Sequence, residues 1–372
     1  MNLDPAGRSS HAMKSGKLAW VEAARGSAAV LVVFVHASSM LSGPKDFGYS
    51  AFAGLFSFGH AGVDFFFVLS GFIILHTHFH ELGRADAAPT YLWKRIVRLF
   101  PSYWVCLALY GAAYAVSPSA TRFEQDAGVI ATSILLIPHP AQLTILSVSW
   151  TLHHELLFYL LFLTLFFSIR AGIFIFGAWA ALCIFHAATG AFGDYPWSFA
   201  FRFFNLEFLV GLGVAYLVRV APAPDAWRIL VPGGVAVFLG AGLYESWGPP
   251  SPTEWLPLHA AYAVGSGMVL YGLVTAERNG SIREAPRWAL AIGSASYSIY
   301  LLHVLTIMVM QQVFRRLSAQ GISLTAEMGF VLAASAAILS GWIFFRVVEQ
   351  PLLRYCRKRF VPRKALRAAN AQ

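Results

Sequence analysis

The sequence has little charge and few cysteines. Charged residues make up 12% of the 372-residue chain and hydrophobic residues 58%, whereas soluble domains have about 25% charged and roughly 45–50% apolar residues. This composition argues against a soluble globular protein. The cysteines are Cys106, Cys183 and Cys356, and their spacing supports neither a disulfide framework nor a metal cluster.

Long apolar runs occupy nearly the whole chain instead. A helix needs roughly 20 apolar residues to cross about 30 Å of hydrocarbon, so these runs predict an all-α polytopic membrane protein with about ten transmembrane helices. The predicted spans are 18–41, 59–79, 99–116, 150–168, 171–189, 201–218, 229–245, 257–276, 292–314 and 325–347. The apolar segment 126–137 is too short to cross and is followed by Pro138 and Pro140, so we expect a re-entrant or interfacial segment there.

The basic residues predict how the chain is oriented. An even number of crossings puts both termini on one side. A cytoplasmic N-terminus then leaves only Lys45, Arg122, Arg202, Arg315 and Arg316 in the outer segments. Because cytoplasmic loops are enriched in Lys and Arg, we expect a multi-pass inner (plasma) membrane protein with both termini in the cytoplasm. The net charge of +9 then indicates the lipid bilayer, and not nucleic acid, as the partner.

One membrane domain accounts for most of the chain. Residues 1–17 are polar and predict a cytoplasmic N-terminal tail. The apolar run that follows is longer than the core of a signal peptide, so it predicts an uncleaved first helix. We expect a single membrane domain over 18–350, without an obvious internal repeat, and a basic cytoplasmic tail over 351–372.

The first span carries ionisable residues, which are costly inside a membrane and are therefore candidates for function. Glu22 and Arg25 are three residues apart, so they can pair on one helix face. His36 lies on nearly the same face, about 16 Å deeper, which puts it near the middle of the membrane. Its imidazole is suited to take a proton from a hydroxyl. A structural histidine that bonds to a neighbouring helix is an equally weighted alternative.

Polar residues also interrupt the second and third spans. Asp64 and Ser70 lie in the apolar run 62–72, whose glycine and serine residues also suit close helix packing. Arg95 and Arg98 are three residues apart at the inner start of the third span. Paired guanidinium groups suit a phosphate-bearing ligand, and membrane orientation alone explains the same pair equally well.

Three later segments add further polar candidates. His76, His78 and His80 alternate at the inner end of the second span, where an interfacial position is favoured over metal binding. The fourth span opens with the run 150–159, and its Glu155 needs a partner on another helix, such as a His or Arg. The sixth span has Arg202 at its outer start and Glu207 inside.

The last two spans hold hydroxyl groups, a histidine and a carboxylate. The run 293–303 contains Tyr297 and ends at His303, and its hydroxyls could join helices or line a polar path. Glu349 closes the last span, where we expect it to pair with Arg346.

Taken together, these segments resemble the membrane-bound acyltransferase family 3, whose members O-acylate cell-surface and exported polysaccharides, lipopolysaccharide and related acceptors. The match covers almost the whole chain, and its specificity comes from the order of several short motifs. These are Glu22, Arg25 and Gly26 followed by His36, the run from Gly62 to Phe72, Arg95 with Arg98 and Pro101, the run from Trp150 to Tyr159, the run ending at His303, and Glu349 before Pro351.

The resemblance implies transfer of an acyl group, usually acetyl, from a cytoplasmic acyl-CoA to a hydroxyl of a glycan or glycolipid acceptor. It implies no bound cofactor. His36 becomes the catalytic histidine with Arg25 as its partner and Glu22 beside them, although an Asp is commoner at that position. Arg95 and Arg98 are expected near the phosphates of the donor. The remaining expected substrate-binding residues are Ser70, Trp150, Glu155, Tyr159, Tyr297 and His303, and no metal site is expected.

Two other classes of function suit a polytopic protein with intramembrane charges. A transporter or flippase for a glycan or lipid-linked sugar is the first, but the chain has no obvious inverted repeat. A membrane scaffold or sensor is the second. It would leave Glu22, Arg25, His36 and Glu155 without a reason for their burial.

Overall fold

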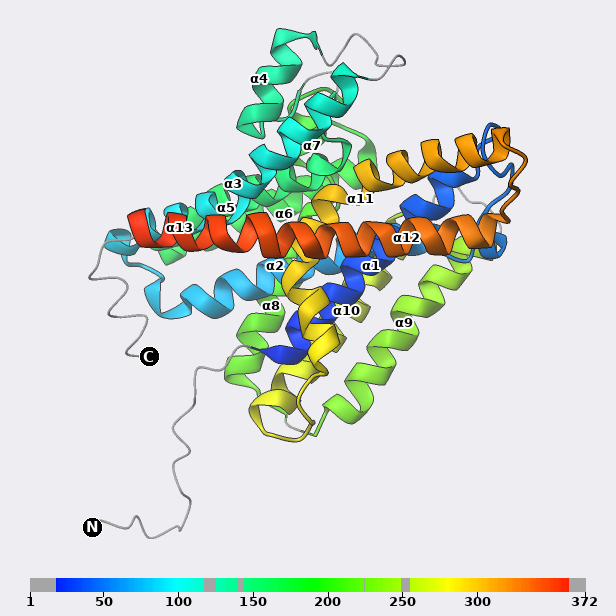
Figure 1. Cartoon of the computed structure of the whole chain (residues 1–372). Helices are drawn as coiled ribbons and strands as arrows, with labels where there is room; N and C mark the ends of the chain where they lie inside the picture. The colour runs from blue at the N-terminus through cyan, green and yellow to red at the C-terminus, as the bar shows by residue number, and fades with distance from the viewer. Residues whose placement is uncertain (1–17, 117–124, 140–142, 224, 249–254, 361–372) are drawn as a thin grey trace.

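The computed structural model describes residues 18–116, 125–139, 143–223, 225–248 and 255–360, which form helices and turns without a β-strand (Figure 1). Ten helical segments in these ranges are long and apolar enough to cross a membrane, which confirms the predicted all-α polytopic fold. Their main helices are α1 (Ala19–Leu41), α2 (Gly62–His78), α3 (Ala88–Ala115), α5 (Trp150–Phe167), α6 (Ile169–Thr189), α8 (Asn205–Val220), α9 (Trp227–Trp247), α10 (Trp255–Arg278), α11 (Arg287–Ala319) and α12 (Ala326–Phe344).

The third span begins well before the predicted boundary at residue 99. Helix α3 starts at Ala88 and continues through Pro101. A proline removes one backbone hydrogen bond, but neighbouring helices in a bundle can compensate for this loss. Arg95 and Arg98 therefore stand on a regular helix and not in the loop before it, which fixes the direction of both side chains.

Three shorter helices complete the fold. Helix α4 (Ala127–Leu135) has nine residues, and a carboxylate oxygen of Asp126 accepts the backbone N–H of Val129 at its start. At 1.5 Å per residue it measures roughly 14 Å, too short to cross a bilayer. Helix α7 (Trp197–Ala200) precedes α8. Helix α13 (Gln350–Phe360) continues α12 through a π-helical turn, so part of the segment expected as a tail is helical.

Close helix packing depends on glycine at two crossings. A Cβ atom at Gly26 of α1 would lie 2.8 Å from the backbone N of Gly293 on α11. On the second crossing, a Cβ atom at Gly71 of α2 would meet the carbonyl oxygen of Phe208 on α8. Because side chains larger than hydrogen would separate these backbones, both helix pairs are joined more tightly than ordinary side-chain packing allows.

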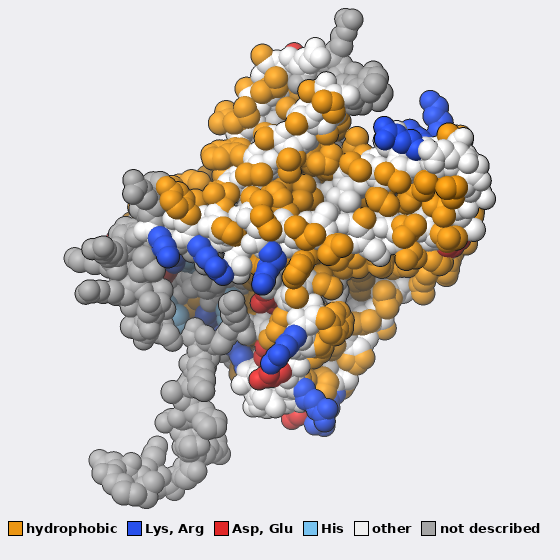
Figure 2. Space-filling view, in the orientation of Figure 1, with side chains coloured by type: hydrophobic (Ala, Val, Ile, Leu, Met, Phe, Trp, Pro, Cys, Tyr) orange, Lys and Arg blue, Asp and Glu red, His pale blue; other side chains and the backbone are white. Residues whose placement is uncertain are grey.

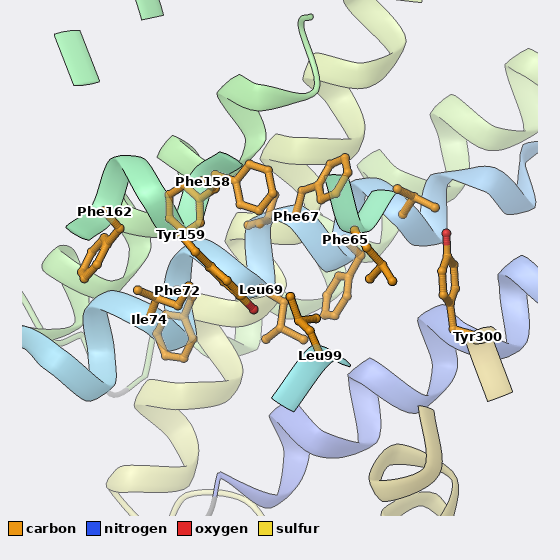
Figure 3. Packing of buried hydrophobic residues seen from close by; sticks show 14 of the residues in the cluster. Phe65, Phe67, Leu69, Phe72, Ile74, Leu99, Phe158, Tyr159, Phe162 and Tyr300 are labelled. Atoms are coloured by element: carbon orange, nitrogen blue, oxygen red, sulfur yellow. The ribbon is translucent and has the colours of Figure 1, made fainter. Parts of the chain in front are cut away.

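An aromatic cluster fills the space between α2, α5 and α8. The rings of Phe158 and Phe208 stack at 4.4 Å, and Phe67 lies 4.7 Å from Phe208. Figure 3 shows the hydroxyl end of Tyr159 pointing away from this cluster, toward Leu69 and Leu99. The cluster therefore forms one wall of the space into which the polar side chains of α5 extend.

The two ends of the bundle differ in charge. We call the end at which α1 begins the inner end and the opposite end the outer end. Figure 2 shows Lys and Arg side chains on α13 and at the lower ends of α10 and α11, which belong to the inner end, and a smaller basic group where α11 ends. This asymmetry has the direction that the sequence predicts for a cytoplasmic inner end.

Candidate active site

A cavity of about 180 Å³ lies between α1, α2, α3, α5 and α11. It brings together seven of the residues that the sequence analysis proposed. These are Arg25, Ser70, Arg95, Arg98, Glu155, Tyr159 and Tyr297. Glu22, His36, Trp150 and His303 do not line it, so the predicted catalytic histidine and the predicted donor residues occupy different places.

Arg25 is fixed by the crossing of α1 and α11. Its Nε and Nη2 atoms donate hydrogen bonds to the carbonyl oxygen of Gly293, at 3.2 and 2.8 Å. The predicted pair with Glu22 does not form, because a carboxylate oxygen of Glu22 accepts the Ser294 hydroxyl instead. A bond to a carbonyl leaves the positive charge of Arg25 unneutralised, so its guanidinium can interact with an anion in the cavity.

Arg98 forms a buried ion pair that the sequence analysis assigned differently. Its Nη1 atom lies 2.5 Å from Oε1 of Glu349, whose side chain is 0% exposed. The other oxygen of Glu349 accepts the hydroxyl of Ser298 at 2.5 Å. The expected pair of Glu349 with Arg346 is therefore wrong, and Arg346 lies instead over the ring of Trp342. The correct partner comes from the distant helix α3.

Glu155 has its partners on α2 and on its own helix. The hydroxyl of Ser70 donates to its Oε1 atom at 2.9 Å, and Tyr159, one turn along α5, donates to the same oxygen. Ser70 is the partner on another helix that the sequence analysis expected, but it is a hydroxyl group and not a His or Arg. Two hydroxyl donors hold the carboxylate at the cavity wall without neutralising its charge.

Arg95 stands at the inner side of the cavity. Its guanidinium lies 5.7 Å from the ring centres of both Tyr91 and Tyr159, and its Nη2 atom is 3.0 Å from Nε2 of His78. In the described part of the chain no carboxylate forms an ion pair with Arg95. Arg25, Arg95 and Arg98 thus give the cavity more positive than negative charge, which favours an anionic ligand.

His36 has a defined tautomer. Its Nδ1 atom is 2.9 Å from the carbonyl oxygen of Val32 and 3.3 Å from Nε2 of His303. A carbonyl only accepts, so Nδ1 of His36 carries the proton. Nε2 of His303 also accepts, because the Nδ1 atom of that ring donates to Tyr300 O at 2.6 Å. Nε2 of His36 therefore keeps its lone pair, the form that a general base requires.

Tyr300 separates the cavity from the pair of histidines. Its side chain lines the cavity, and its hydroxyl donates to the carbonyl of Val148 and contacts the hydroxyl of Thr151 at 2.9 Å. The ring centres of Tyr300 and His303 are 5.7 Å apart, and those of His303 and His36 are 4.7 Å apart. His36 is half-buried and lies five residues before the end of α1, nearer the outer end than the predicted mid-membrane position.

Comparison with known proteins decides the class of this arrangement. Residues 18–347 match the family model described as an acyltransferase domain. The chain belongs to this acyltransferase family. It is 29% identical over 325 residues to the exopolysaccharide production protein ExoZ of Rhizobium meliloti (strain 1021), which covers 82% of this chain and 93% of that protein.

A second relative is shorter. Protein 2 in the picA locus of Rhizobium radiobacter is 30% identical over 151 residues, which cover 36% of this chain and 73% of that protein. No solved structure matches the chain.

The acyltransferase contains a second polar cluster near the outer end. Nδ1 of His259 contacts Asp64 and lies 3.6 Å from Oε1 of Glu207. Both oxygens of Glu207 are buried and accept no hydrogen bond from the described residues, and its side chain is 1% exposed. Asp64, Glu207 and His259 thus share a buried site, and among the described residues none of them forms an ion pair with an arginine or a lysine.

A neighbouring set of contacts extends this cluster toward the surface. Glu245 of α9 lies 2.5 Å from Nε2 of His60 and accepts the hydroxyl of Tyr262 at 2.5 Å. The rings of His60 and His259 are 6.1 Å apart. These contacts join α2, α8, α9 and α10. We name the set the outer polar cluster, and its residues are Asp64, Glu207, His259, His60 and Glu245.

Sequence reasoning missed three of the five residues of this cluster. It singled out Asp64 and Glu207 as charges inside spans, but it did not consider His60, His259 or Glu245. An ionisable residue near the start of an apolar helix was the available signal for His259. Trp150 was selected, but it packs against Phe204 at 5.5 Å and does not reach the cavity.

Proposed function

We propose that this acyltransferase moves an acyl group from an acyl-CoA at the inner end to a hydroxyl of an exported or cell-surface polysaccharide. His36 is the general base in this proposal. The observation that carries it is the hydrogen bonding of His36, which leaves Nε2 as a proton acceptor on a half-buried ring.

The donor part of the proposal rests on the charge of the cavity. Coenzyme A carries phosphates at one end and the thioester at the other, and the cavity has three guanidinium groups with only one of them, Arg98, in an ion pair. Guanidinium groups bind phosphate well. We infer that the donor enters from the inner end with its phosphates near Arg95, and that the inner end faces the cytoplasm.

The reaction follows from the position of the two histidines. Nε2 of His36 takes the proton of the acceptor hydroxyl while the hydroxyl oxygen attacks the thioester carbon. The tetrahedral intermediate collapses with cleavage of the C–S bond, and the thiolate of coenzyme A takes up a proton as it leaves. His303 accepts a bond from Nδ1–H of His36, which holds the ring in the reactive orientation.

The acceptor part rests on the relatives and on the outer end. One relative is named for exopolysaccharide production. His36 lies close to the outer end of α1, so a glycan hydroxyl can approach it from that side while the donor reaches it from the cavity. In the cavity as described, Tyr300 stands between the two, so its side chain must move to admit the thioester. Acetyl is the acyl group we propose.

The test uses purified protein in lipid nanodiscs with acetyl-CoA and polysaccharide from cells that lack the protein. We expect free thiol to appear and the polysaccharide to gain the mass of an acetyl group. A transporter or flippase would consume no thioester. Absence of thiol release with every acyl-CoA tried, while the protein remains monodisperse, would refute the proposed donor.

A further inference from the structure

Three histidines at the inner end of the second span each contact an arginine from a different helix. Nε2 of His78 faces Arg95, as described above. Nε2 of His76 lies 3.1 Å from Nη2 of Arg278 on α10, and Nε2 of His80 lies 3.4 Å from Nη1 of Arg219 on α8. We name Arg219, Arg278, His76 and His80 the inner basic cluster.

The cluster gathers positive charge without a matching carboxylate. Nη2 of Arg219 also donates to the carbonyl oxygen of His76 at 2.8 Å, so both arginines meet at one histidine. In the described residues neither arginine forms an ion pair with Asp or Glu. The nearby carboxylate of Glu277 accepts the backbone N–H groups of Ala19 and Trp20 instead. Like charges held together in this way favour an anion between them.

Hydrogen-bond donors of the cluster are also left without acceptors. Because Nε2 of His76 faces a guanidinium, which only donates, Nδ1 carries the proton. That Nδ1 atom and Nε of Arg219 are both buried and have no hydrogen-bond partner among the described residues. Buried donors are nearly always bonded in native proteins, so an acceptor group is expected here.

The cluster continues from the inner side of the cavity. Ile73 and Ile74 line the cavity, and His76 follows on the same helix. Arg95 also lines the cavity and reaches His78, which lies between His76 and His80 in the chain. The positive groups therefore occur in a fixed order, from Arg98 and Arg95 at the cavity to Arg219 and Arg278 beyond it.

We propose that the inner basic cluster binds the 3′-phosphate of the CoA donor. The inference rests on the proposed function. In coenzyme A the thiol, the pantetheine arm, the diphosphate and the 3′-phosphate of the ribose follow one another. If the arm lies in the cavity with the diphosphate near Arg95, the 3′-phosphate meets the last cations in the order, Arg219 and Arg278. Two guanidinium forks and the N–H of His76 match the oxygens of a phosphate monoester.

The experiment compares CoA with dephospho-CoA, which lacks only the 3′-phosphate. The dissociation constant of each is measured for the full chain in nanodiscs of phosphatidylcholine. We expect the wild type to bind CoA roughly tenfold or more tightly than dephospho-CoA, as charge-assisted bonds to a phosphate predict. In the double variant Arg219→Gln, Arg278→Gln this ratio should fall to about 1, while the affinity for dephospho-CoA stays within about twofold of the wild type.

The matched control removes two positive charges from the same end of the molecule. Arg228 at the start of α9 and Arg287 at the start of α11 are exposed and lie outside the cluster. The double variant Arg228→Gln, Arg287→Gln should keep the wild-type preference for CoA. Equal preference in the two double variants would overturn the inference, as would a wild type that does not distinguish CoA from dephospho-CoA. Retained dephospho-CoA binding in the cluster variant also shows that it is folded.

An anionic lipid headgroup is the other source of a phosphate at this end. The same measurements in nanodiscs that contain phosphatidylglycerol separate the two. If the double variant Arg219→Gln, Arg278→Gln loses affinity for CoA and dephospho-CoA equally, and only in nanodiscs with phosphatidylglycerol, the cluster binds lipid and the inference is overturned. Thiol release is measured separately. A wild type that prefers CoA but releases no thiol would refute the proposed reaction without affecting the assignment of the cluster.

Discussion

The inner and outer halves of this acyltransferase hold their buried charges in different ways. Around the cavity and inward, arginines outnumber carboxylates, and Glu349 is neutralised by Arg98. In the outer polar cluster, Asp64 and Glu207 face His259 without an arginine in their ion pairs. A cationic half suits an anionic donor, whereas carboxylates and imidazoles suit hydroxyl groups and protons. The comparison therefore supports the proposal that the donor binds toward the inner end and the acceptor toward the outer end.

The largest expected effect is at the histidine between the two halves. His36→Ala should lower the rate of acyl transfer by about 10²–10⁴-fold, because a general base contributes that much. Thiol release by purified protein measures this effect. His186→Ala, near the outer end of α6, is the control and should keep the wild-type rate. Full activity of His36→Ala would show that His36 is not the general base.

Breaking the ion pair of the inner half should cause the largest loss of stability. Arg98→Ala leaves the carboxylate of Glu349 buried and unpaired, so we expect the free energy of unfolding to fall by about 3–5 kcal/mol. Denaturant or thermal unfolding in detergent measures the change. The double variant Arg98→Ala, Glu349→Gln should recover part of the stability, because it removes the uncompensated charge. Equal stability of the single and double variants would contradict the pairing.

The outer half should respond unequally to the loss of its two carboxylates. Asp64→Asn removes the charged acceptor of His259 and should cost about 1–3 kcal/mol of unfolding free energy. Glu207→Gln replaces a buried carboxyl group whose oxygens accept no hydrogen bond from the described residues, so the free energy of unfolding should stay within about 1 kcal/mol of the wild type or rise. The same unfolding assay compares them. If Glu207→Gln lowered the free energy of unfolding more than Asp64→Asn, the outer half would depend on a paired buried charge, as the inner half does.

The smallest expected effect concerns Glu155, which belongs to the cavity but has no cationic partner. Ser70→Ala removes one of its two hydroxyl donors, and Tyr159 remains, so we expect a loss of about 1 kcal/mol in the free energy of unfolding. Thr164→Ala, which removes a hydroxyl bonded only within α5, is the matched control. If Ser70→Ala lowered the free energy of unfolding as much as Arg98→Ala, the stability of the fold would depend on the partners of Glu155 as strongly as on the ion pair of Arg98 with Glu349.

The sequence predicted the spans better than the partners of the charges. Hydrophobic length and composition determine a transmembrane helix locally, so ten spans were predicted, and the described residues contain ten helical segments long and apolar enough to cross a membrane. The start of α3 was missed because Pro101 and two arginines suggested a helix boundary. The pair of Arg98 with Glu349 joins residues 251 positions apart, and no local pattern encodes such a contact.

The candidate site shows the same limit. Seven of the residues selected from the motifs line one cavity. Spacing in the sequence, however, predicted two pairs that do not form, Glu22 with Arg25 and Arg346 with Glu349. In each case a side chain or carbonyl from another helix competes with the neighbour three residues away. Local spacing predicts which residues share a helix face, and only the packing of helices decides which of them meet.

The crossing of α1 and α11 has a consequence for the choice of donor. The two helices run in the same direction, with Arg25 bonded to Gly293 near one end and His36 in contact with His303 near the other. The spacing between the anion-binding region and the imidazole is therefore set by two backbones in close contact, which side-chain rotation cannot change. If the donor is the acyl-CoA proposed above, an N-acetylcysteamine thioester, which has a short arm and no phosphate, cannot reach both ends at once, and we expect this spacing to disfavour it.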